Sequence, residues 1–398
     1  MTTCDVAIIG GGPAGSTCAW QLRRAGADVV VWDRRRFPRD KICAGWITPQ
    51  VLAELEIDPA DYARDDRTLQ PIRGFAVSRL GDAEARVRYD RAVSYGIRRC
   101  EFDAYLLRRS QARLRLGEPV APLARVGGQW LLNGVVRAKM VVGAGGHFCP
   151  VAQSLGARLG VGEPIVAAQE TEFELTPEQQ RACDVDPELP EIYFTRDLRG
   201  YGWVFRKGNY INIGLGRQDT HKLGHHVDEF LGFLERRRKI PSDLPAKLKG
   251  HPYLLYGQAP RPLIGDDVML IGDAAGLAYP KSGEGIRPAV ESGLLAAQTI
   301  LAAAGRYDRA HLEPYERAMI GRFGSRQAGP GVTDLVPTRL LGAVAGHLFG
   351  TDWFARHVVL NRWFFHSRSA PLKGLQGAPA AHTRDAPAGH AGFGLPGG

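Results

Sequence analysis

Asp5-Val-Ala-Ile-Ile-Gly-Gly-Gly-Pro-Ala-Gly15, close to the start of the chain, predicts a short buried strand that runs into a glycine-rich turn. Apolar residues at helical spacing follow from Ser16 to Arg24, and Gly26 ends that predicted helix. A second strand, Val29 to Trp32, ends at Asp33. A G-x-G-x-x-G pattern alone is a weak signal, but this one follows a strand, opens a helix and precedes an acidic residue. The unit is typical of a dinucleotide-binding fold.

The glycines of this motif have separate predicted roles. Gly10 permits a tight turn, Gly12 lets the backbone approach a pyrophosphate, and Gly15 allows the helix to pack closely on the sheet. The positive end of the helix, which includes Ala14, would face the phosphates, and Asp33 would accept hydrogen bonds from ribose hydroxyls. A glycine-rich turn without a ligand is the alternative interpretation.

Two later apolar runs, Met140–Ala144 and Val268–Ile271, predict further parallel strands, each followed by glycines. Other stretches alternate in polarity and predict a second, antiparallel sheet: Ile72–Ser78, Arg86–Tyr89, Ile165–Leu175, Ile192–Thr195, Trp203–Arg206 and Tyr210–Leu215. Lys207-Gly208-Asn209 predicts a hairpin turn between the last two. The predicted class is α/β, α+β overall, with an antiparallel-sheet domain inserted into a Rossmann-like domain.

The order of these elements predicts discontinuous domains. We expect a nucleotide-binding domain over 1–71, 95–160 and 261–310, and a mixed-sheet domain over 72–94 and 161–260. A helical region is expected over 311–373. Residues 374–398 are rich in Gly, Pro, Ala and His, which predicts a disordered tail.

The composition excludes several classes of protein. With 398 residues, 44% of them apolar and 23% charged, the chain can bury one large core or two ordinary ones, so a small stapled scaffold or a wholly disordered chain is excluded. The net charge is +9, but basic residues occur in short scattered runs without interleaved aromatics, so no nucleic-acid partner is expected. Six cysteines without a C-x-x-C pattern predict no metal site and fit a reducing cytoplasm.

The sequence predicts no membrane span, because no run of about 18 uninterrupted apolar residues occurs, and it shows no signal peptide. Aromatic and basic residues are mixed between Leu340 and Phe365, as in a helix that lies at a membrane interface. One interpretation is therefore a cytoplasmic protein with peripheral contact at the inner face of the membrane. The alternative is that this helix packs on the protein core.

Five motifs in order make the chain resemble the geranylgeranyl reductase family of FAD-dependent oxidoreductases, which belongs to the flavoproteins related to p-hydroxybenzoate hydroxylase. The motifs are Gly10-x-Gly12-x-x-Gly15, Phe37-Pro-Arg-Asp-Lys-Ile-Cys-Ala-Gly45, Arg99-x-x-Phe102-Asp103, Gly272-Asp273-Ala-Ala-Gly276 with Gly283-Glu-Gly285-Ile286, and Tyr201-Gly-Trp203-Val-Phe205 followed by Asn212-Ile-Gly-Leu-Gly216. The resemblance covers roughly residues 5–298. It implies that the discontinuous domain binds FAD and that the inserted sheet forms the substrate domain.

The resemblance also implies where FAD is held. Asp273 would meet the ribitol hydroxyls, and backbone from Pro280 to Ile286 would lie beside the flavin ring, where a helix N-terminus stabilises the reduced form. Backbone near Val120 would hold the adenine. A helix N-cap is the alternative role for Asp273. The expected cofactor-binding residues are Gly10, Gly12, Ala14, Gly15, Asp33, Cys43, Ala44, Gly45, Arg99, Val120, Asp273, Pro280, Gly283, Gly285 and Ile286.

One motif departs from the hydroxylase relatives. They carry an Asp-Gly pair after the middle strand, associated with FAD and NAD(P)H, whereas this chain has Ala144-Gly-Gly-His147. NADPH and NADH are therefore only two candidates for the electron donor. No catalytic residue is assigned, because His147, His225 and His226 show no acid partner at a recognisable spacing. A redox role for Cys43 and simple small-residue packing both stay open.

Tyr201, Trp203 and Phe205 alternate along a predicted strand and would share one face, either as an apolar wall of a substrate pocket over the flavin or as ordinary core. The leading hypothesis is an enzyme that reduces C=C bonds of a hydrophobic isoprenoid or lipid-like substrate by hydride transfer from reduced flavin. One alternative is a monooxygenase that uses O2 through a flavin hydroperoxide. Another is a non-catalytic flavin- or lipid-binding accessory protein.

Overall fold

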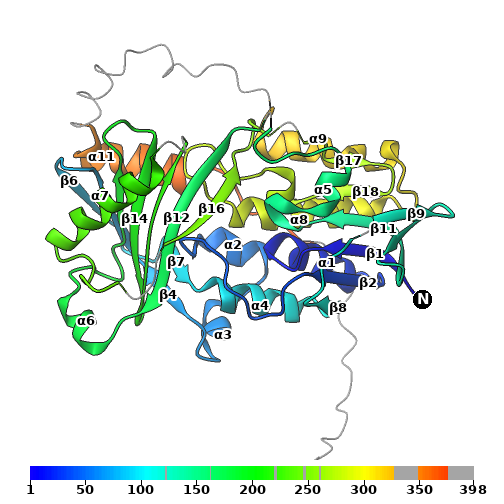
Figure 1. Ribbon diagram of the computed structural model, residues 1–398, viewed down its shortest axis with the longest axis horizontal. Coiled ribbons are helices and arrows are strands. Elements are labelled where there is room, and N and C mark those ends of the chain that lie inside the picture. The colour runs from blue at the N-terminus through cyan, green and yellow to red at the C-terminus, as the bar shows by residue number, and fades with distance from the viewer. Residues whose placement is uncertain are drawn as a thin grey trace, which may run out of the picture.

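The computed structural model describes residues 1–121, 123–161, 163–218, 222–244, 248–259, 261–326 and 348–374. In this part of the chain two large β-sheets lie next to each other, with helices packed on both (Figure 1). The first sheet contains the N-terminal strand, and the second is built mainly from the middle of the sequence. This mixed architecture confirms the predicted fold class.

The first sheet is built around the predicted nucleotide-binding unit. Its strand order is β17 (Ile264–Gly265), β18 (Val268–Leu270), β11 (Val136–Gly143), β1 (Thr2–Ile9), β2 (Val29–Asp33) and β8 (Arg113–Leu116), and β9 (Leu123–Val126) and β10 (Gln129–Leu132) extend from β11. β1 pairs in parallel with β2 and with β11, and β11 pairs in parallel with β18. The C-terminal halves of the central strands, Val6–Ile9 in β1 and Met140–Gly143 in β11, are apolar because both faces of the sheet are covered there. Val6, Ile8 and Val31 are fully buried.

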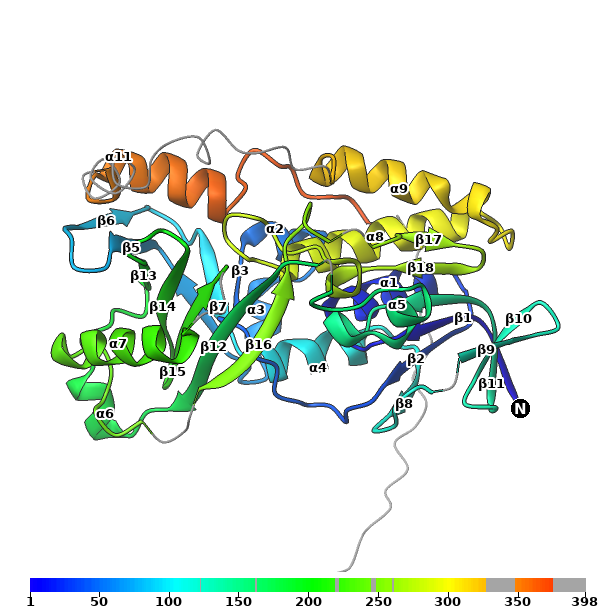
Figure 2. The same ribbon diagram turned by 45° about the horizontal axis from the view of Figure 1, so that its top comes forward.

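Two long helices pack against each other on this sheet (Figures 1 and 2). They are α1 (Pro13–Arg24) and α8 (Ile286–Ala302). A Cβ on Gly293 would lie 2.6 Å from the carbonyl oxygen of Ala14, so only glycine allows α8 to approach α1 this closely. The other helices of this half are α2 (Pro49–Glu54), α3 (Pro59–Ala63), α4 (Arg99–Arg109), α5 (Pro150–Ser154) and α9 (Arg309–Phe323).

The second sheet follows the predicted strands closely. Its order is β16 (Lys249–Leu254), β12 (Ile165–Glu174), β15 (Tyr210–Arg217), β14 (Gly200–Lys207), β13 (Glu191–Phe194), β5 (Gly74–Arg79) and β6 (Glu84–Arg88). The two-residue turn Gly208-Asn209 joins β14 to β15, as predicted. Strand β16 was not predicted, because Pro252 interrupts its apolar pattern; proline is tolerated there because β16 is an edge strand.

One pairing differs from the predicted antiparallel arrangement. β5 and β13 run in parallel, with Ala76 opposite Glu191 and Arg79 opposite Phe194. Short hairpins force strands to be antiparallel, but these two strands are joined by a long excursion through the other sheet, which leaves either direction open. The sheet is therefore mixed.

The two faces of the second sheet are covered by different helices. On one face, α7 (Leu223–Arg236) buries Phe230 and Leu234, and α6 (Pro177–Ala182) lies near the same end (Figure 1). On the other face lie α11 (Asp352–Phe354) and the π-helix η4 (Ala355–Phe364) (Figure 2). A small sheet of β3 (Trp46–Ile47), β7 (Ser94–Ile97) and β4 (Leu69–Ile72) lies between the two halves.

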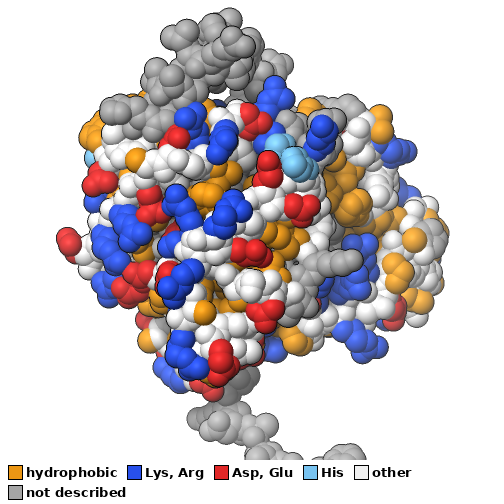
Figure 3. All heavy atoms as spheres, turned by 60° about the vertical axis from the view of Figure 1, so that its left-hand side comes forward, with side chains coloured by type: hydrophobic (Ala, Val, Ile, Leu, Met, Phe, Trp, Pro, Cys, Tyr) orange, Lys and Arg blue, Asp and Glu red, His pale blue; other side chains and the backbone are white. Residues whose placement is uncertain are grey.

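The C-terminal helix packs on the core and also exposes side chains. Val359, Leu360 and Phe364 are buried against the second sheet, whereas the Trp353 side chain is 66% exposed. Part of the predicted interfacial segment, including Leu340, and the tail from 375 to 398 lie outside the described residues. None of the described helices is long and apolar enough to cross a membrane. The end of the molecule that holds the second sheet carries positive and negative side chains interspersed (Figure 3).

Candidate functional site

The glycine motif forms a tight turn in front of α1. Gly10 has φ +120°, and a Cβ there would lie 2.2 Å from the carbonyl oxygen of Ala144 on the neighbouring strand end. A Cβ on Gly15 would lie 1.9 Å from the carbonyl oxygen of Gly10. At Gly12 the only described atom within 4 Å of a Cβ would be Nη2 of Arg39, at 3.5 Å. The N-terminus of α1 is therefore open at Gly12, whereas Ala14 in its first turn is buried.

Asp33 lies at this turn, as the motif predicts. Its carboxylate accepts hydrogen bonds from the backbone N–H of Gly11 and of Arg35, both at 2.8 Å. Val120 is buried in the same core, and the nearby backbone is fixed to β2 because the Trp32 indole N–H donates to the Glu118 carbonyl at 3.0 Å. The structure thus places Asp33 and the Val120 segment at the ends of neighbouring strands.

Arg99 begins helix α4 and forms a buried ion pair. Its guanidinium donates two hydrogen bonds to the Asp103 carboxylate, at 2.8 and 2.9 Å, and Arg39 lies 3.3 Å from the same carboxylate. Asp103 is fully buried, so each arginine compensates a charge that would otherwise be costly. This pairing fastens the 37–45 loop to α4.

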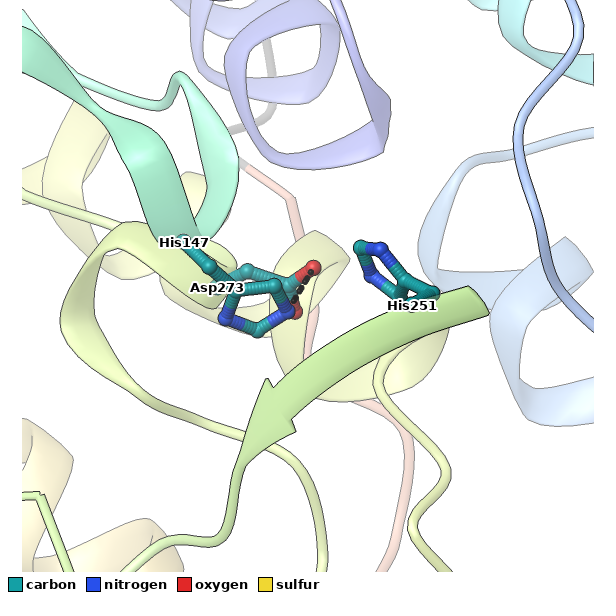
Figure 4. A group of neighbouring side chains, drawn as sticks. All are labelled: His147, His251 and Asp273. Atoms are coloured by element: carbon teal, nitrogen blue, oxygen red, sulfur yellow. Dashed lines mark ion pairs between the residues drawn. The ribbon is translucent and has the colours of Figure 1, made fainter. Parts of the chain in front are cut away.

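Asp273 lies in the turn η2 (Gly272–Ala275), and His147 in the turn η1 (Gly146–Phe148), which follow the parallel neighbours β18 and β11. His147 Nε2 is 3.1 Å from the Asp273 carboxylate, and His251 of β16 faces the same carboxylate (Figure 4). The Lys41 ammonium is 2.7 Å from His251 Nε2. The Lys41 ammonium thus occupies the place beside His251 that a metal ion would need, and the group is a charged polar cluster with its own cation.

The titratable groups of this cluster shift one another's pKa values. Burial alone would raise the pKa of Asp273, but His147, Lys41 and His251 outweigh it and hold that pKa well below its usual range. Burial, together with Lys41 and His147, lowers the pKa of His251 to about 3. Burial also lowers the pKa of Lys41. Asp273 is therefore a carboxylate and His251 a neutral imidazole at pH 7.

The backbone from Pro280 to Ile286 lies next to Asp273. A Cβ on Gly285 would lie 3.3 Å from Asp273 Oδ1, and one on Gly283, where φ is +65°, would lie 2.7 Å from the Tyr253 hydroxyl. No side-chain hydrogen bond caps η2 or α8, so the alternative N-cap role of Asp273 is not observed. Pro280 is exposed and Ile286 is buried at the start of α8.

The Cys43-Ala44-Gly45 segment lies against the second sheet. The backbone N–H of Cys43 donates to Glu170 Oε1 at 2.5 Å, and its carbonyl accepts from the Asn212 amide at 3.2 Å. A Cβ on Gly45 would lie 2.4 Å from the carbonyl oxygen of Ile97, so this turn also requires glycine. The segment thus joins the second sheet to the small sheet of β3, β7 and β4.

Tyr201, Trp203 and Phe205 share one face of β14, as predicted, and belong to an aromatic cluster. Trp203 and Phe205 are buried, and the Trp203 indole N–H donates to the side-chain Oδ1 of Asn212 at 2.7 Å. The Tyr201 hydroxyl donates to the backbone carbonyl of Ser282 in the 280–286 segment. The aromatic cluster consists of Trp46, Phe75, Phe194, Tyr201, Trp203, Phe205, Phe364 and Phe365.

Sequence reasoning missed four polar residues at this site: Lys41, His147, Glu170 and His251. The acid partner of His147 is Asp273, which comes much later in the chain and reaches it only because β11 and β18 are neighbours. His225 and His226, by contrast, lie near Glu229 on α7, which covers the opposite face of the second sheet. Glu170 could have been noticed, because it occupies the same face of its predicted strand as the buried Val166 and Ala168.

Comparisons with known proteins show the family to which the chain belongs. Residues 5–104 match the model of a family described as FAD dependent oxidoreductase. A menaquinone reductase of Mycobacterium tuberculosis is 30% identical over 331 residues, which cover 75% of this chain and 76% of that protein. A digeranylgeranylglycerophospholipid reductase of Methanocaldococcus jannaschii is 26% identical, over 79% of this chain and 81% of that protein.

A solved structure shares the fold. It is a geranylgeranyl bacteriochlorophyll reductase-like protein from Thermoplasma acidophilum, with a TM-score of 0.71 and 23% identity over 88% of this chain and 90% of that one. The length and level of these matches, together with the dinucleotide-binding turn, establish the class of enzyme and its cofactor, FAD. The chain belongs to the geranylgeranyl reductase family of FAD-dependent oxidoreductases.

Proposed function

We propose that this enzyme reduces C=C bonds in an isoprenoid or similar lipid-like substrate. The observation that carries the proposal is the hydrogen bond from the Tyr201 hydroxyl to the Ser282 carbonyl. It places the aromatic cluster directly beside the 280–286 segment, where the flavin ring is expected. An apolar, aromatic surface at this position suits a hydrocarbon chain better than a polar substrate.

In this proposal FAD is held by the discontinuous domain of residues 1–71, 95–160 and 261–310. The residues present fit it: the N-terminus of α1 is open at Gly12, and the Asp273 carboxylate adjoins a segment in which a side chain would be strained at Gly283 and tight at Gly285. Asp33 and the Val120 backbone would hold the adenosine half. The remaining contacts would come from Ala14, Arg99, the 43–45 segment, Pro280 and Ile286. When bound and reduced, FAD supplies a hydride.

The inserted residues 72–94 and 161–260 would hold the substrate in this proposal. Tyr201, Trp203 and Phe205 would exclude water and position the chain of the substrate against the cofactor. Support comes from the relatives, because menaquinone and digeranylgeranylglycerophospholipids both carry isoprenoid chains. NADPH or NADH is the proposed electron donor. We also propose that the protein works in the cytoplasm at the inner face of the membrane, with Trp353 at the lipid surface.

The proposal is tested with the purified FAD enzyme, reduced under anaerobic conditions and mixed with geranylgeranyl diphosphate or with menaquinone. The expected result is reoxidation of the flavin spectrum together with a product heavier by two hydrogen atoms. A product that gains an oxygen atom when O2 is admitted would instead identify a monooxygenase. If neither substrate is altered and no donor and acceptor pair supports turnover, the chain is a binding protein. Titration with NADPH and NADH identifies the donor.

A further inference from the structure

Glu170 is a buried carboxyl group on the face of the second sheet that borders the 43–45 segment. It lies in β12 opposite Gly214 of β15, and Gly214 is in turn opposite Trp203 of β14. The residue is 5% exposed. Its side chain is therefore in the same row as the aromatic cluster, on the side of the sheet that faces the proposed flavin position.

The hydrogen bonding of Glu170 is incomplete. Oε1 accepts the Cys43 backbone N–H at 2.5 Å, whereas Oε2 has no hydrogen-bond partner among the described residues. Glu172, two positions along the same strand, is different, because its carboxylate accepts from Lys207 at 2.6 Å and from Asn212 at 3.3 Å. A buried carboxyl oxygen without a partner costs stability. Stabilisation of the fold therefore explains the position of the Glu172 carboxylate, but it does not explain the unpartnered oxygen of Glu170.

Burial raises the pKa of Glu170, and the charged groups around it only partly oppose this effect. Lys41 of the 37–45 loop and Lys207 of β14 favour the carboxylate, as does the Cys43 N–H, whereas Glu172 opposes it. On β16 the directly opposite residue is Lys249, which is exposed. Burial is the largest effect and raises the pKa of Glu170 to about 7. A carboxyl group with such a pKa can donate a proton at neutral pH and then recover it.

We propose that Glu170 is the catalytic acid that donates a proton to the substrate when its C=C bond is reduced. This inference rests on the proposed function. The π bond breaks and two C–H bonds form: one carbon receives the hydride that reduced FAD supplies, and its neighbour receives the proton of the Glu170 carboxyl. The substrate is reduced by two electrons and FAD is oxidised by two. Glu170 is left as a carboxylate and takes a new proton from water.

The test compares the wild-type FAD enzyme with Glu170→Gln, and uses Glu174→Gln as the matched control. Glu174 lies on the same strand and face but is exposed, and its carboxylate accepts a hydrogen bond from the Tyr210 hydroxyl at 3.1 Å. Glu170→Gln is expected to bind FAD with an unchanged visible spectrum but to reduce geranylgeranyl diphosphate or menaquinone about 100-fold more slowly at saturation. Glu174→Gln is expected to keep the wild-type rate. Glu170→Asp should restore part of the lost rate.

Two further measurements separate proton donation from a structural role. Infrared titration of the FAD enzyme without substrate should show, in the wild type and in Glu174→Gln, a component of the protonated carboxyl band that disappears near pH 7 and is missing from Glu170→Gln. The component of Glu284, whose pKa burial also raises to about 7, should be present in all three proteins. The wild-type rate should fall as pH rises through this midpoint, and Glu170→Gln should lose that dependence. A wild-type rate in Glu170→Gln, or an unchanged titrating band, overturns the proposal. If the wild type reduces neither lipid while the band titrates, it is the proposed function that fails.

Discussion

His147 Nε2 lies 3.1 Å from the Asp273 carboxylate, which joins the turn after β11 to the turn after β18. The carboxyl ends of parallel neighbouring strands meet at one edge of a sheet, so these two turns are close although they are distant in sequence. Because His147 is almost fully buried, its contact with Asp273 is little screened by solvent. The carboxylate is thus held in place before a ligand arrives.

Replacing His147 by alanine should weaken FAD binding. The variant leaves Asp273 without its nearest partner, so the carboxylate is held less firmly and its pKa rises towards the usual range. We expect the Kd of FAD to increase about tenfold, which corresponds to about 1.4 kcal/mol. Fluorescence titration of FAD-free protein with FAD measures this change. His225→Ala, on the exposed surface of α7, is the control, and equal affinities in the two variants would contradict the role of His147.

Most strands of the two sheets could be predicted from the sequence, but the contacts between the sheets could not. Strand periodicity predicted both sheets, and alternation correctly predicted that Tyr201, Trp203 and Phe205 share a face. In the cluster around Asp273, Lys41 comes from a loop and His251 lies on the edge strand β16, which was not predicted. Periodicity carries no information on how a loop docks on a distant strand. The parallel pair β5 and β13 was missed for a related reason, since local pattern does not fix strand direction.

Gly15→Ala should destabilise the protein. Its Cβ would be 1.9 Å from the carbonyl oxygen of Gly10, and backbone cannot move aside cheaply. We expect the free energy of unfolding to fall by about 3 kcal/mol, in the range of other overpacked sites. Gly321→Ala in α9 is the matched control, because no described atom lies within 4 Å of its Cβ; it should be neutral or slightly stabilising. Urea unfolding of both variants tests this, and a similar midpoint shift in both would contradict the packing argument.

Trp353→Ala should reduce binding to anionic lipid vesicles. The Trp353 side chain is 66% exposed, and the exposed basic residue Arg362 follows it in η4. An exposed tryptophan on a helical segment that also exposes a basic side chain favours the interfacial region of a bilayer. Flotation with vesicles at low salt should recover several-fold less of the variant than of the wild type. Ile320→Ala, which removes a 53% exposed side chain from α9, should float like the wild type. Failure of the wild type itself to float would end the membrane hypothesis.

Acid should destabilise the fold through His251. Its pKa is about 3 in the folded protein because of burial and of Lys41 and His147, whereas an unfolded histidine titrates near 6.5. Between these values the unfolded chain binds one more proton than the folded one, so the free energy of unfolding falls as pH decreases below about 6.5. At pH values where the unfolded histidine is fully charged, this difference of one proton lowers the free energy of unfolding by about 1.4 kcal/mol for each unit that the pH falls. His251→Gln should remove that contribution, and His225→Gln, at an exposed position of α7, should not. Urea unfolding at a series of pH values from 7 to 5 measures the slope, and identical slopes for His251→Gln and the wild type would show that His251 is not buried as a neutral group.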